Sequence, residues 1–200
     1  MRIPYVPNPP QPATEEEAAI VGRIAARRAP RGLQPLDLAL LHAPAVADGW
    51  NSFLGAVRTR TTLGARAREV AICRVAACNG AWYEWGHHAP LAREAGVSEE
   101  GMGVVGREEL VPEGRSEEEV RSEAQGVGLG EREWAVLRYA DEMTRRVSVS
   151  DEVFAALRRV CSEREVVEVT ATVAAYNCVS RFLVALDVGE KNGTGPDAGH

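Results

Sequence analysis

The sequence predicts an all-α protein, and two observations carry this prediction. Apolar residues recur at helical spacing between polar start signals and glycine or proline stops; Thr14 and Glu17, for example, have the spacing of a capping box. In addition, no segment alternates apolar and polar residues between two turns, which is the pattern of a half-buried strand. We therefore expect a mostly or wholly helical chain.

Most of the expected helices have a recognisable cap, stop or apolar stripe. Gly96 is placed as a C-cap glycine, and Ser150 and Ser162 are placed as N-caps. Residues 97–131 are less regular, and we expect short helical turns and a long surface connection there, with a solvated run of charges. In chain order, the predicted helices run from Thr14 to before Pro30, over 36–42, 45–59, 66–78, 81–95, 133–145 and 151–160, and from Ser162 through Leu186.

Three parts of the chain differ in composition. Residues 1–13 form a Pro-rich N-terminal arm with five prolines, which favours an extended conformation, either free or lying across a neighbouring subunit. Residues 14–188 are predicted to form a single helical domain, since 200 residues suffice for one domain with a substantial core. Residues 189–200 are rich in glycine and polar residues and are predicted to be a disordered tail.

The net charge and the apolar content of the sequence indicate which partners and which location to expect. The net charge of −6 argues against nucleic-acid binding, which usually requires a basic patch. No apolar signal segment is present, and no run approaches the length needed to span a bilayer, so we expect a cytoplasmic protein without a membrane partner.

The cysteines and two arginines are given structural interpretations. No two of the four cysteines form C-x-x-C, and because all four lie in apolar stretches we expect small buried hydrophobic residues. Arg68 and Arg74 could meet a substrate carboxylate, but surface arginines are the better interpretation.

A weak internal repeat relates the two halves of the chain. Arg68-Glu69-Val70 aligns with Arg164-Glu165-Val166, and both triplets open an apolar helix. In this alignment Glu84 is matched by Ser180 and His88 by Val184. The pattern predicts two pseudo-repeated helical halves, with the chemistry in the first half.

Glu69, Glu84 and His88 are the candidate catalytic residues. Glu84 and His88 lie four positions apart and share a helix face, so they could hydrogen-bond or converge on one ligand. Buried ionisable groups are costly unless they are paired or useful, which favours proton-transfer chemistry. An ordinary exposed acid–histidine pair has the same spacing, and the spacing alone does not separate the two interpretations.

Other residues are candidates for lining a pocket. A metal site is the minor interpretation, because no H-x-x-x-H or H-x-H spacing supports it, and we predict none. His87 points elsewhere on the helix and is expected at a surface or interface, and His42 could equally cap a helix. The candidate substrate-binding residues are His42, Trp50, Trp82 and His87.

Two segments resemble the carboxymuconolactone decarboxylase family, which includes the alkyl hydroperoxidase D (AhpD) peroxidases. They read L-G-A-R-A-R-E-V-A-I-C-R-V-A over 63–76 and Y-E-W-G-H-H-A-P-L-A-R-E-A-G-V-S over 83–98, within a resemblance that covers roughly residues 36–188. The resemblance implies an AhpD-like all-helical fold, an active site near subunit contacts and a homo-oligomer, a trimer or a hexamer.

The resemblance also separates two branches of the family. The peroxidase branch carries a glutamate, then C-x-x-C, then a histidine; counted from Glu69, the cysteine positions are Ala81 and Glu84, and the histidine is His88. Without the redox cysteines, no thiolate can attack a peroxide and no disulfide can form. The decarboxylase branch is more similar, since it lacks the redox pair and uses no cofactor.

The expected function is therefore a cofactor-independent decarboxylase acting on a small carboxylated lactone or keto-enol acid. His88 is expected to act as the acid or oxyanion donor, Glu84 to orient it or relay the proton, and Glu69 to complete the site. The alternatives are an isomerase, dehydratase or cyclase of secondary metabolism on the same site, a peroxidase-like redox protein, which the missing C-x-x-C disfavours, and a non-catalytic oligomeric scaffold.

Overall fold

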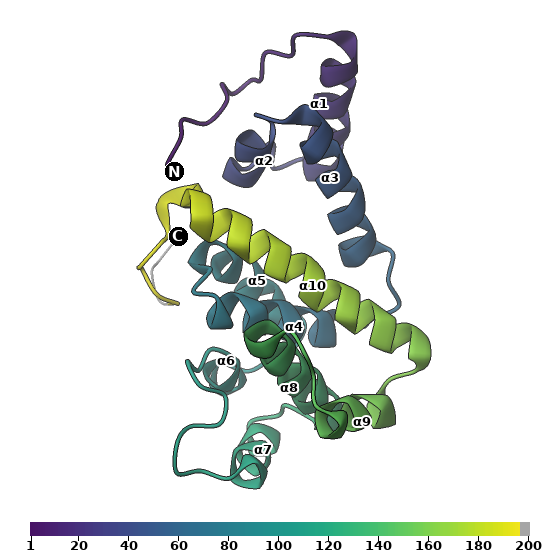
Figure 1. Ribbon diagram of the computed structural model, residues 1–200, viewed down its shortest axis with the longest axis vertical. Helices are drawn as coiled ribbons and strands as arrows, with labels where there is room; N and C mark the ends of the chain where they lie inside the picture. Colours follow the sequence, from purple (N-terminus) through teal and green to yellow (C-terminus); the bar gives the residue numbers. More distant parts are fainter. Residues whose placement is uncertain (197–200) are drawn as a thin grey trace. The chain divides into compact units, whose positions relative to one another are not determined.

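The computed structural model describes residues 1–196, and this part of the chain is helical and contains no strand, as predicted (Figure 1). The elements are α1 (Glu15–Arg28), α2 (Pro35–Leu40), α3 (Pro44–Thr59), α4 (Ala65–Cys78), α5 (Trp82–Glu94), α6 (Glu99–Val105), α7 (Glu117–Gly126), α8 (Glu131–Arg146), α9 (Asp151–Val160), α10 (Glu163–Leu186) and the 3₁₀ turn η1 (Val188–Glu190).

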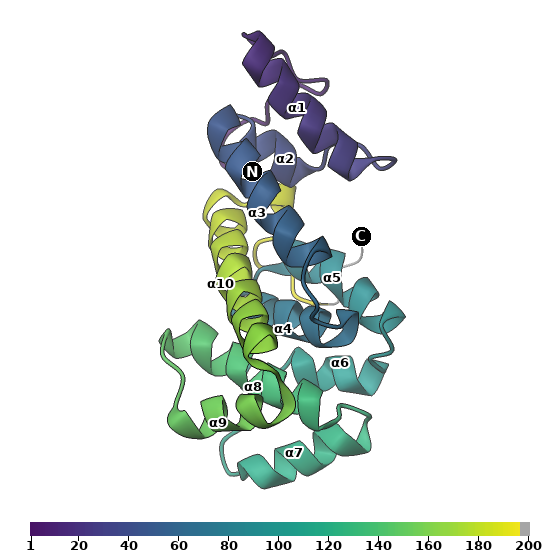
Figure 2. The same cartoon turned by 90° about the vertical axis from the view of Figure 1, so that its right-hand side faces the viewer.

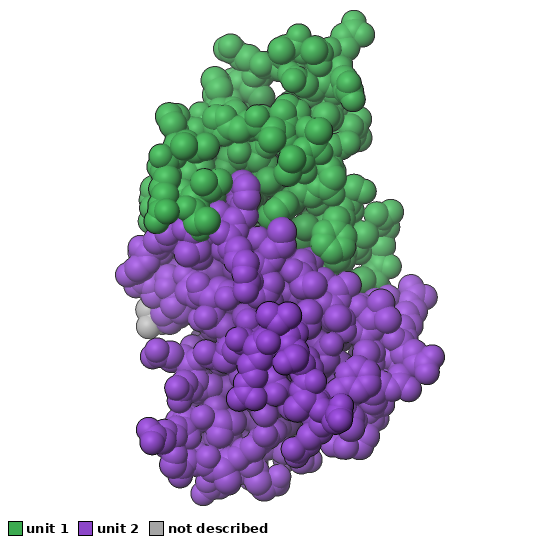
Figure 3. Space-filling view, in the orientation of Figure 1, with its two compact units in different colours: residues 1–61, 185–190 green, residues 62–184, 191–200 purple. Residues whose placement is uncertain are grey.

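The chain divides into two compact units (Figure 3). The first comprises residues 1–61 and 185–190, and the second comprises residues 62–184 with the segment that begins at Lys191. The sequence predicts one domain over 14–188, which stays a prediction; the contacts group the first three helices with residues 185–190. The fourth to ninth helices and most of α10 form the other unit.

In the first unit, the Pro-rich arm lies against its own chain. The Arg2 amide donates to the Leu186 carbonyl at 2.8 Å, and the Gly189 amide donates to the Tyr5 hydroxyl at 2.8 Å. These two contacts anchor the arm to the segment around η1. The predicted disordered tail overlaps this turn at 189–190, while residues 197–200 of that tail lie outside the described residues.

In the second unit, α4 is the central helix. Eight consecutive residues, 69–76, are buried, so α4 is buried on all sides rather than along one stripe. It packs chiefly against α5 and α8. Residues 163–184 of α10 lie across α4 and α8 in both views (Figures 1 and 2). The Tyr139 hydroxyl of α8 is 2.9 Å from Thr170 Oγ1 of α10.

The capping signals predict the helix starts correctly. The Glu17 amide donates to Thr14 Oγ1, the Val153 amide donates to Ser150, and the Glu165 amide donates to Ser162. These bonds satisfy amides that a helix start leaves without an intrahelical partner.

Residues 97–131 are more regular than predicted. The segment contains α6, whose Met102, Val104 and Val105 side chains belong to the core, and the ten-residue α7. Ser116 and Glu119 form a capping box at the start of α7. The charge run therefore belongs to an amphipathic helix, because Val120 and Ala124 within it are completely buried.

By length and composition, α10 could cross a membrane, contrary to the expectation that no run approaches that length. In this structure, however, 44% of its most apolar window is buried. The Asn177 amide of α10 also donates to Thr144 of α8 at 3.0 Å. Part of this apolar helix is therefore buried, and it is hydrogen-bonded to α8.

Arg74 is the largest completely buried side chain, so the interpretation of this residue as a surface arginine is wrong. Its guanidinium donates to Asp141 of α8, with Nε 2.9 Å from Oδ1, and Nη1 donates to the Val105 carbonyl at 2.9 Å. Burial acts to raise the pKa of Asp141, but the charges and hydrogen bonds of Arg74 and Arg145 outweigh it and lower that pKa. Arg74 therefore joins α4, α8 and the end of α6.

Candidate functional site

A buried glutamate–histidine pair joins α4 to α5. Gly80, with φ of +60°, lies in the turn between the two helices, where a left-handed residue is favoured as glycine. The turn brings His88 next to Glu69, and His88 Nδ1 is 2.7 Å from Glu69 Oε2. Glu69 is 2% exposed and His88 is 5% exposed, so this hydrogen bond is shielded from water.

Glu69 is held in its ionised form by its partners. Burial acts to raise its pKa, but the hydrogen bond and charge of His88, together with the charge and hydrogen bond of Arg68, outweigh burial and lower the pKa. Arg68 Nε donates to Glu69 Oε1 at 3.1 Å, while His88 occupies Oε2. One carboxylate thus lies between two groups that can carry positive charge.

Glu84 occupies a different environment from the one predicted. The carboxylate at His88 Nδ1 is Glu69, from the neighbouring helix, whereas Glu84 meets Ser180 of α10, whose Oγ lies 3.1 and 3.3 Å from its two oxygens. Glu84 is 2% exposed. Burial raises the pKa of Glu84 well above the usual range.

Two further side chains complete the surroundings of these carboxyl groups. The ring of Tyr176, on α10, meets the His88 ring edge-on, with centroids 4.9 Å apart. Cys73 lies one turn after Glu69 on α4 and is completely buried; its pKa is raised well above the usual range by burial and by the charges of Glu69 and Glu84. Cys73 is thus a neutral thiol beside both acids.

The residues that sequence reasoning missed are Ser180, Tyr176 and the role of Arg68. A signal for Ser180 was present, because the alignment of the two halves matches Ser180 with Glu84, and these two residues touch in the structure. The contact between Tyr176 and His88 has no local sequence signal, since the two residues are 88 positions apart in the chain.

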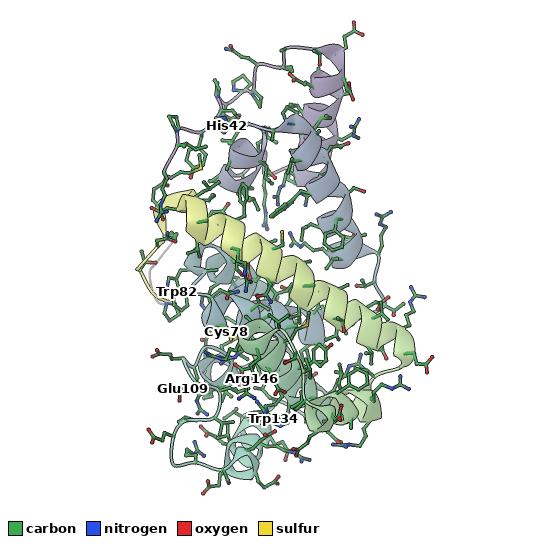
Figure 4. All side chains as sticks on the ribbon, in the orientation of Figure 1. His42, Cys78, Trp82, Glu109, Trp134 and Arg146 are labelled. Atoms are coloured by element: carbon green, nitrogen blue, oxygen red, sulfur yellow. The ribbon has the colours of Figure 1, made fainter. Side chains whose placement is uncertain are left out.

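The four candidate substrate-binding residues are distributed over both units; Figure 4 labels two of them, His42 and Trp82. His42 and Trp50 belong to the first unit, where His42 is exposed and its Nε2 lies 2.8 Å from the Pro4 carbonyl. Trp82, half-buried, begins α5 and meets Trp85 edge-on at 6.3 Å. His87 is exposed, as predicted, and stacks on Tyr83 with its Nδ1 2.9 Å from the Tyr83 carbonyl.

The cysteines and acids near the site do not favour thiol or metal chemistry. Among residues 1–196, no group of three or more His, Cys, Asp or Glu residues could hold a metal ion. Cys78 donates to Asp141 at 3.4 Å, and burial, with Asp141, raises its pKa to about 11. Cys178 is exposed and Cys78 is half-buried, so the expectation that all four cysteines are buried holds only for Cys73 and Cys161.

The described helices of the second unit thus hold a buried carboxylate–imidazole pair, Glu69 and His88, and a second buried carboxyl group, Glu84. Residues 44–114 match the model of the carboxymuconolactone decarboxylase family. The match includes Glu69, Glu84 and His88 and confirms the resemblance carried by the sequence motifs. No curated protein matches the chain significantly by sequence.

Solved structures share this fold at low sequence identity. A protein of unknown function from Agrobacterium tumefaciens, whose description links it to the antioxidant defence protein AhpD, is 21% identical, with a TM-score of 0.60 over 74% of this chain and 92% of its own. An uncharacterised peroxidase-related protein from Silicibacter sp. TM1040 is 14% identical, with a TM-score of 0.69 over 95% of each chain.

A third similar structure has a described activity. The debrominase Bmp8, in a cysteine-to-alanine form in complex with 2,3,4-tribromopyrrole, is 18% identical, with a TM-score of 0.67 over 94% of this chain and 92% of its own. At these identities the three structures establish the AhpD-like fold of the chain.

Proposed function

We propose that this protein is a cofactor-independent decarboxylase that acts on a small carboxylated lactone or keto-enol acid. The observation that carries the proposal is the buried hydrogen bond between Glu69 and His88, which gives a defined acid/base pair in a family named for a decarboxylation. A carboxylate on Nδ1 fixes the orientation of an imidazole and stabilises its protonated form.

The charges of the pair suit an anionic substrate. Arg68 and His88 both contact the single carboxylate of Glu69, and with His88 protonated the site would carry one net positive charge. A substrate carboxylate would be attracted to this charge, and removal of water around it would strengthen the attraction. The substrate would bind as a carboxylate and leave as carbon dioxide and a neutral or less charged product.

The reaction requires little from the protein. When the carbon–carbon bond to the carboxylate breaks, the electron pair stays on the substrate carbon and spreads onto a neighbouring carbonyl as an enolate. His88 Nε2–H would donate to this developing oxyanion, because Nδ1 is already held by Glu69. A proton must then be delivered to the carbon to complete the product.

A redox function fits the cysteines less well. Cys73 is buried with a raised pKa, and Cys78 has a pKa of about 11, so neither is a thiolate near neutral pH. A debrominase or peroxidase activity that depends on such a thiolate would have to use a different group here.

The second candidate is an isomerase, dehydratase or cyclase that uses the same Glu69–His88 pair without loss of a carboxylate. The observation that favours it is the neutral, buried Glu84 carboxyl group, which can serve any reaction that passes through an enolate. Carbon dioxide release distinguishes the two, since an isomerase would consume the substrate without producing it.

The test measures carbon dioxide release and substrate consumption on a panel of carboxylated lactones and keto acids. We expect His88→Ala and Glu69→Gln to lower kcat about 100-fold or more, the usual contribution of one acid/base group. Glu94→Gln, which changes an exposed glutamate on α5, is the matched control and should keep the wild-type rate. Wild-type rates in both site variants would overturn the assignment, and a melting curve like that of the wild type would show that they fold.

The proposal also includes the oligomeric state and the location of the enzyme. A homo-oligomer, a trimer or a hexamer, in the cytoplasm remains our expectation, as do two pseudo-repeated halves. Light scattering of the purified protein measures the oligomer number directly, and a monomer would contradict this part of the proposal.

A further inference from the structure

The Glu84 carboxyl group differs from Glu69 in every partner that it has. Its two oxygens face the Ser180 hydroxyl at 3.1 and 3.3 Å, and its side chain is almost completely shielded from water. Glu69, by contrast, meets a guanidinium and an imidazole. The two acids therefore sit in the same buried region with opposite electrostatic surroundings.

Counting the hydrogens around Ser180 indicates where a proton resides. A serine hydroxyl has one hydrogen, and Ser180 Oγ is 2.7 Å from the Tyr176 carbonyl, which can only accept. This is the shortest of its contacts, and a helical serine commonly donates to the carbonyl four residues earlier. Only lone pairs of Oγ then remain to face Glu84. A hydrogen bond over the 3.1 Å contact therefore requires the hydrogen to lie on the Glu84 carboxyl group.

The other groups around Glu84 do not favour a negative charge there. From α4, Glu69 is ionised and Cys73 is a neutral thiol within electrostatic range of both acids. From α10, the neighbours Ser180 and Tyr176 are neutral, and the imidazole of His88, one turn later on α5, is bound to Glu69. Burial, the main effect on Glu84, disfavours the charged form.

We propose that Glu84 is kept as a neutral carboxylic acid at neutral pH and is the proton donor that completes the reaction. The group of Arg68, Glu69 and His88 carries the charges and binds the anion. This assignment rests on the proposed function. Two carboxyl groups whose surroundings separate their protonation states are a recognised way of providing an acid and a base in one site.

The proposed step balances without any further reactant. Carbon dioxide leaves, and the electron pair of the broken bond remains on the substrate carbon. This pair takes the Glu84 proton to form a carbon–hydrogen bond, and Glu84 becomes a carboxylate. Water then returns a proton to Glu84, so each turnover consumes one proton from solvent. A fixed carboxylate would instead repel an anionic substrate, which gives a second reason for Glu84 to be neutral.

The protonation state is tested by infrared difference spectroscopy of the whole protein at pH 7. Subtraction of the Glu84→Gln spectrum from that of the wild type should reveal the carbonyl band of a protonated carboxylic acid, shifted in heavy water. Glu94→Gln is the control, and the same subtraction should show no such band. A carboxylate band lost in Glu84→Gln would overturn the proposal, whatever the activity.

The donor role is tested by kinetics on a substrate that the wild type turns over. Glutamine has the shape of a neutral carboxyl group but no acidic proton, so we expect kcat of Glu84→Gln to fall about 100-fold or more, with KM little changed. The wild-type kcat should also decline on the alkaline side as Glu84 ionises, and the variant should lack this decline. A wild-type kcat in Glu84→Gln would overturn the donor role.

The two proposals fail in different ways. If the wild type releases no carbon dioxide and consumes none of the carboxylated lactones and keto acids, the proposed function and the donor role are both wrong. The infrared band still decides whether Glu84 is a neutral acid. Normal turnover with an ionised Glu84 would leave the proposed function in place and remove this inference alone.

Discussion

The substitution Glu84→Gln is predicted to change the pH dependence of stability in a defined direction. In the unfolded chain the pKa of a glutamate is about 4.3, whereas burial raises the pKa of Glu84 in the folded protein. A raised folded pKa gives an acid its full contribution to stability below the unfolded pKa. That contribution is lost as the pH rises toward the folded pKa, because only the unfolded chain ionises there. Glutamine does not ionise in either state.

The magnitude follows from the linkage relation. Each pH unit between the two pKa values costs the wild type about 1.4 kcal/mol relative to the variant. Integrated from pH 5 to pH 7 with Glu84 neutral in the folded protein throughout, the difference is about 2.6 kcal/mol. Between pH 5 and pH 7, Glu84→Gln should therefore gain about that amount of stability relative to the wild type.

The assay is urea unfolding followed by far-ultraviolet circular dichroism at pH 5, 6 and 7. Titration of Glu69, His88 and the exposed groups is common to both proteins and cancels in the difference. Glu94→Gln, on the same helix but exposed, should give a curve parallel to that of the wild type. Parallel curves for Glu84→Gln as well would refute the reasoning, because they would mean that Glu84 ionises in the folded protein much as it does in the unfolded chain.

Three further predictions test other parts of the structure. Arg74→Met should lower the free energy of unfolding by about 3–5 kcal/mol in chemical denaturation, because it leaves the buried Asp141 without its main counterion; a loss below about 1 kcal/mol would contradict this role. Glu69→Gln should lower stability at pH 7 but not at strongly acid pH. The reason is that the lowered pKa of Glu69 contributes stability above the unfolded pKa of about 4.3, and this stability is lost as the pH falls through the folded pKa. An equal loss at both pH values in thermal melting would count against the ionised pair. N-ethylmaleimide should modify the exposed Cys178 of the folded protein well before Cys73, as mass spectrometry can follow, and leave turnover unchanged; complete inactivation with an intact fold would restore a cysteine mechanism.

Capping residues are the local sequence signals that predicted the helix starts correctly. Thr14, Ser150 and Ser162 each mark a helix start that the structure confirms, because a side-chain oxygen three residues before an unpaired amide can satisfy it without help from the rest of the fold. The segment 97–131 was harder to predict. The apolar stripe of α7 has only Val120 and Ala124 at its centre, and its burial depends on helices that follow in the chain.

Sequence reasoning identified the candidate residues of the site but predicted the wrong pairing between them. Spacing identified Glu69, Glu84 and His88, but it paired Glu84 with His88 because four residues make one helical turn. The structure pairs His88 with Glu69, since the turn at Gly80 reverses the chain and sets the faces of α4 and α5 against each other. A tertiary contact of this kind joins residues 19 positions apart, and no local periodicity encodes it.

By itself, the sequence determined the all-helical class, the resemblance to the carboxymuconolactone decarboxylase family and the three candidate residues of the site, because caps, apolar spacing and motifs are local properties. Only the tertiary structure decided in which direction the pKa of each acid shifts. Glu69 and Glu84 are the same residue type with the same intrinsic pKa, and their difference arises from Arg68 and His88 beside one and from burial beside Ser180 for the other. Arg74 illustrates the same point, since a charged side chain can be completely buried only where the fold supplies an acid and carbonyls to receive it.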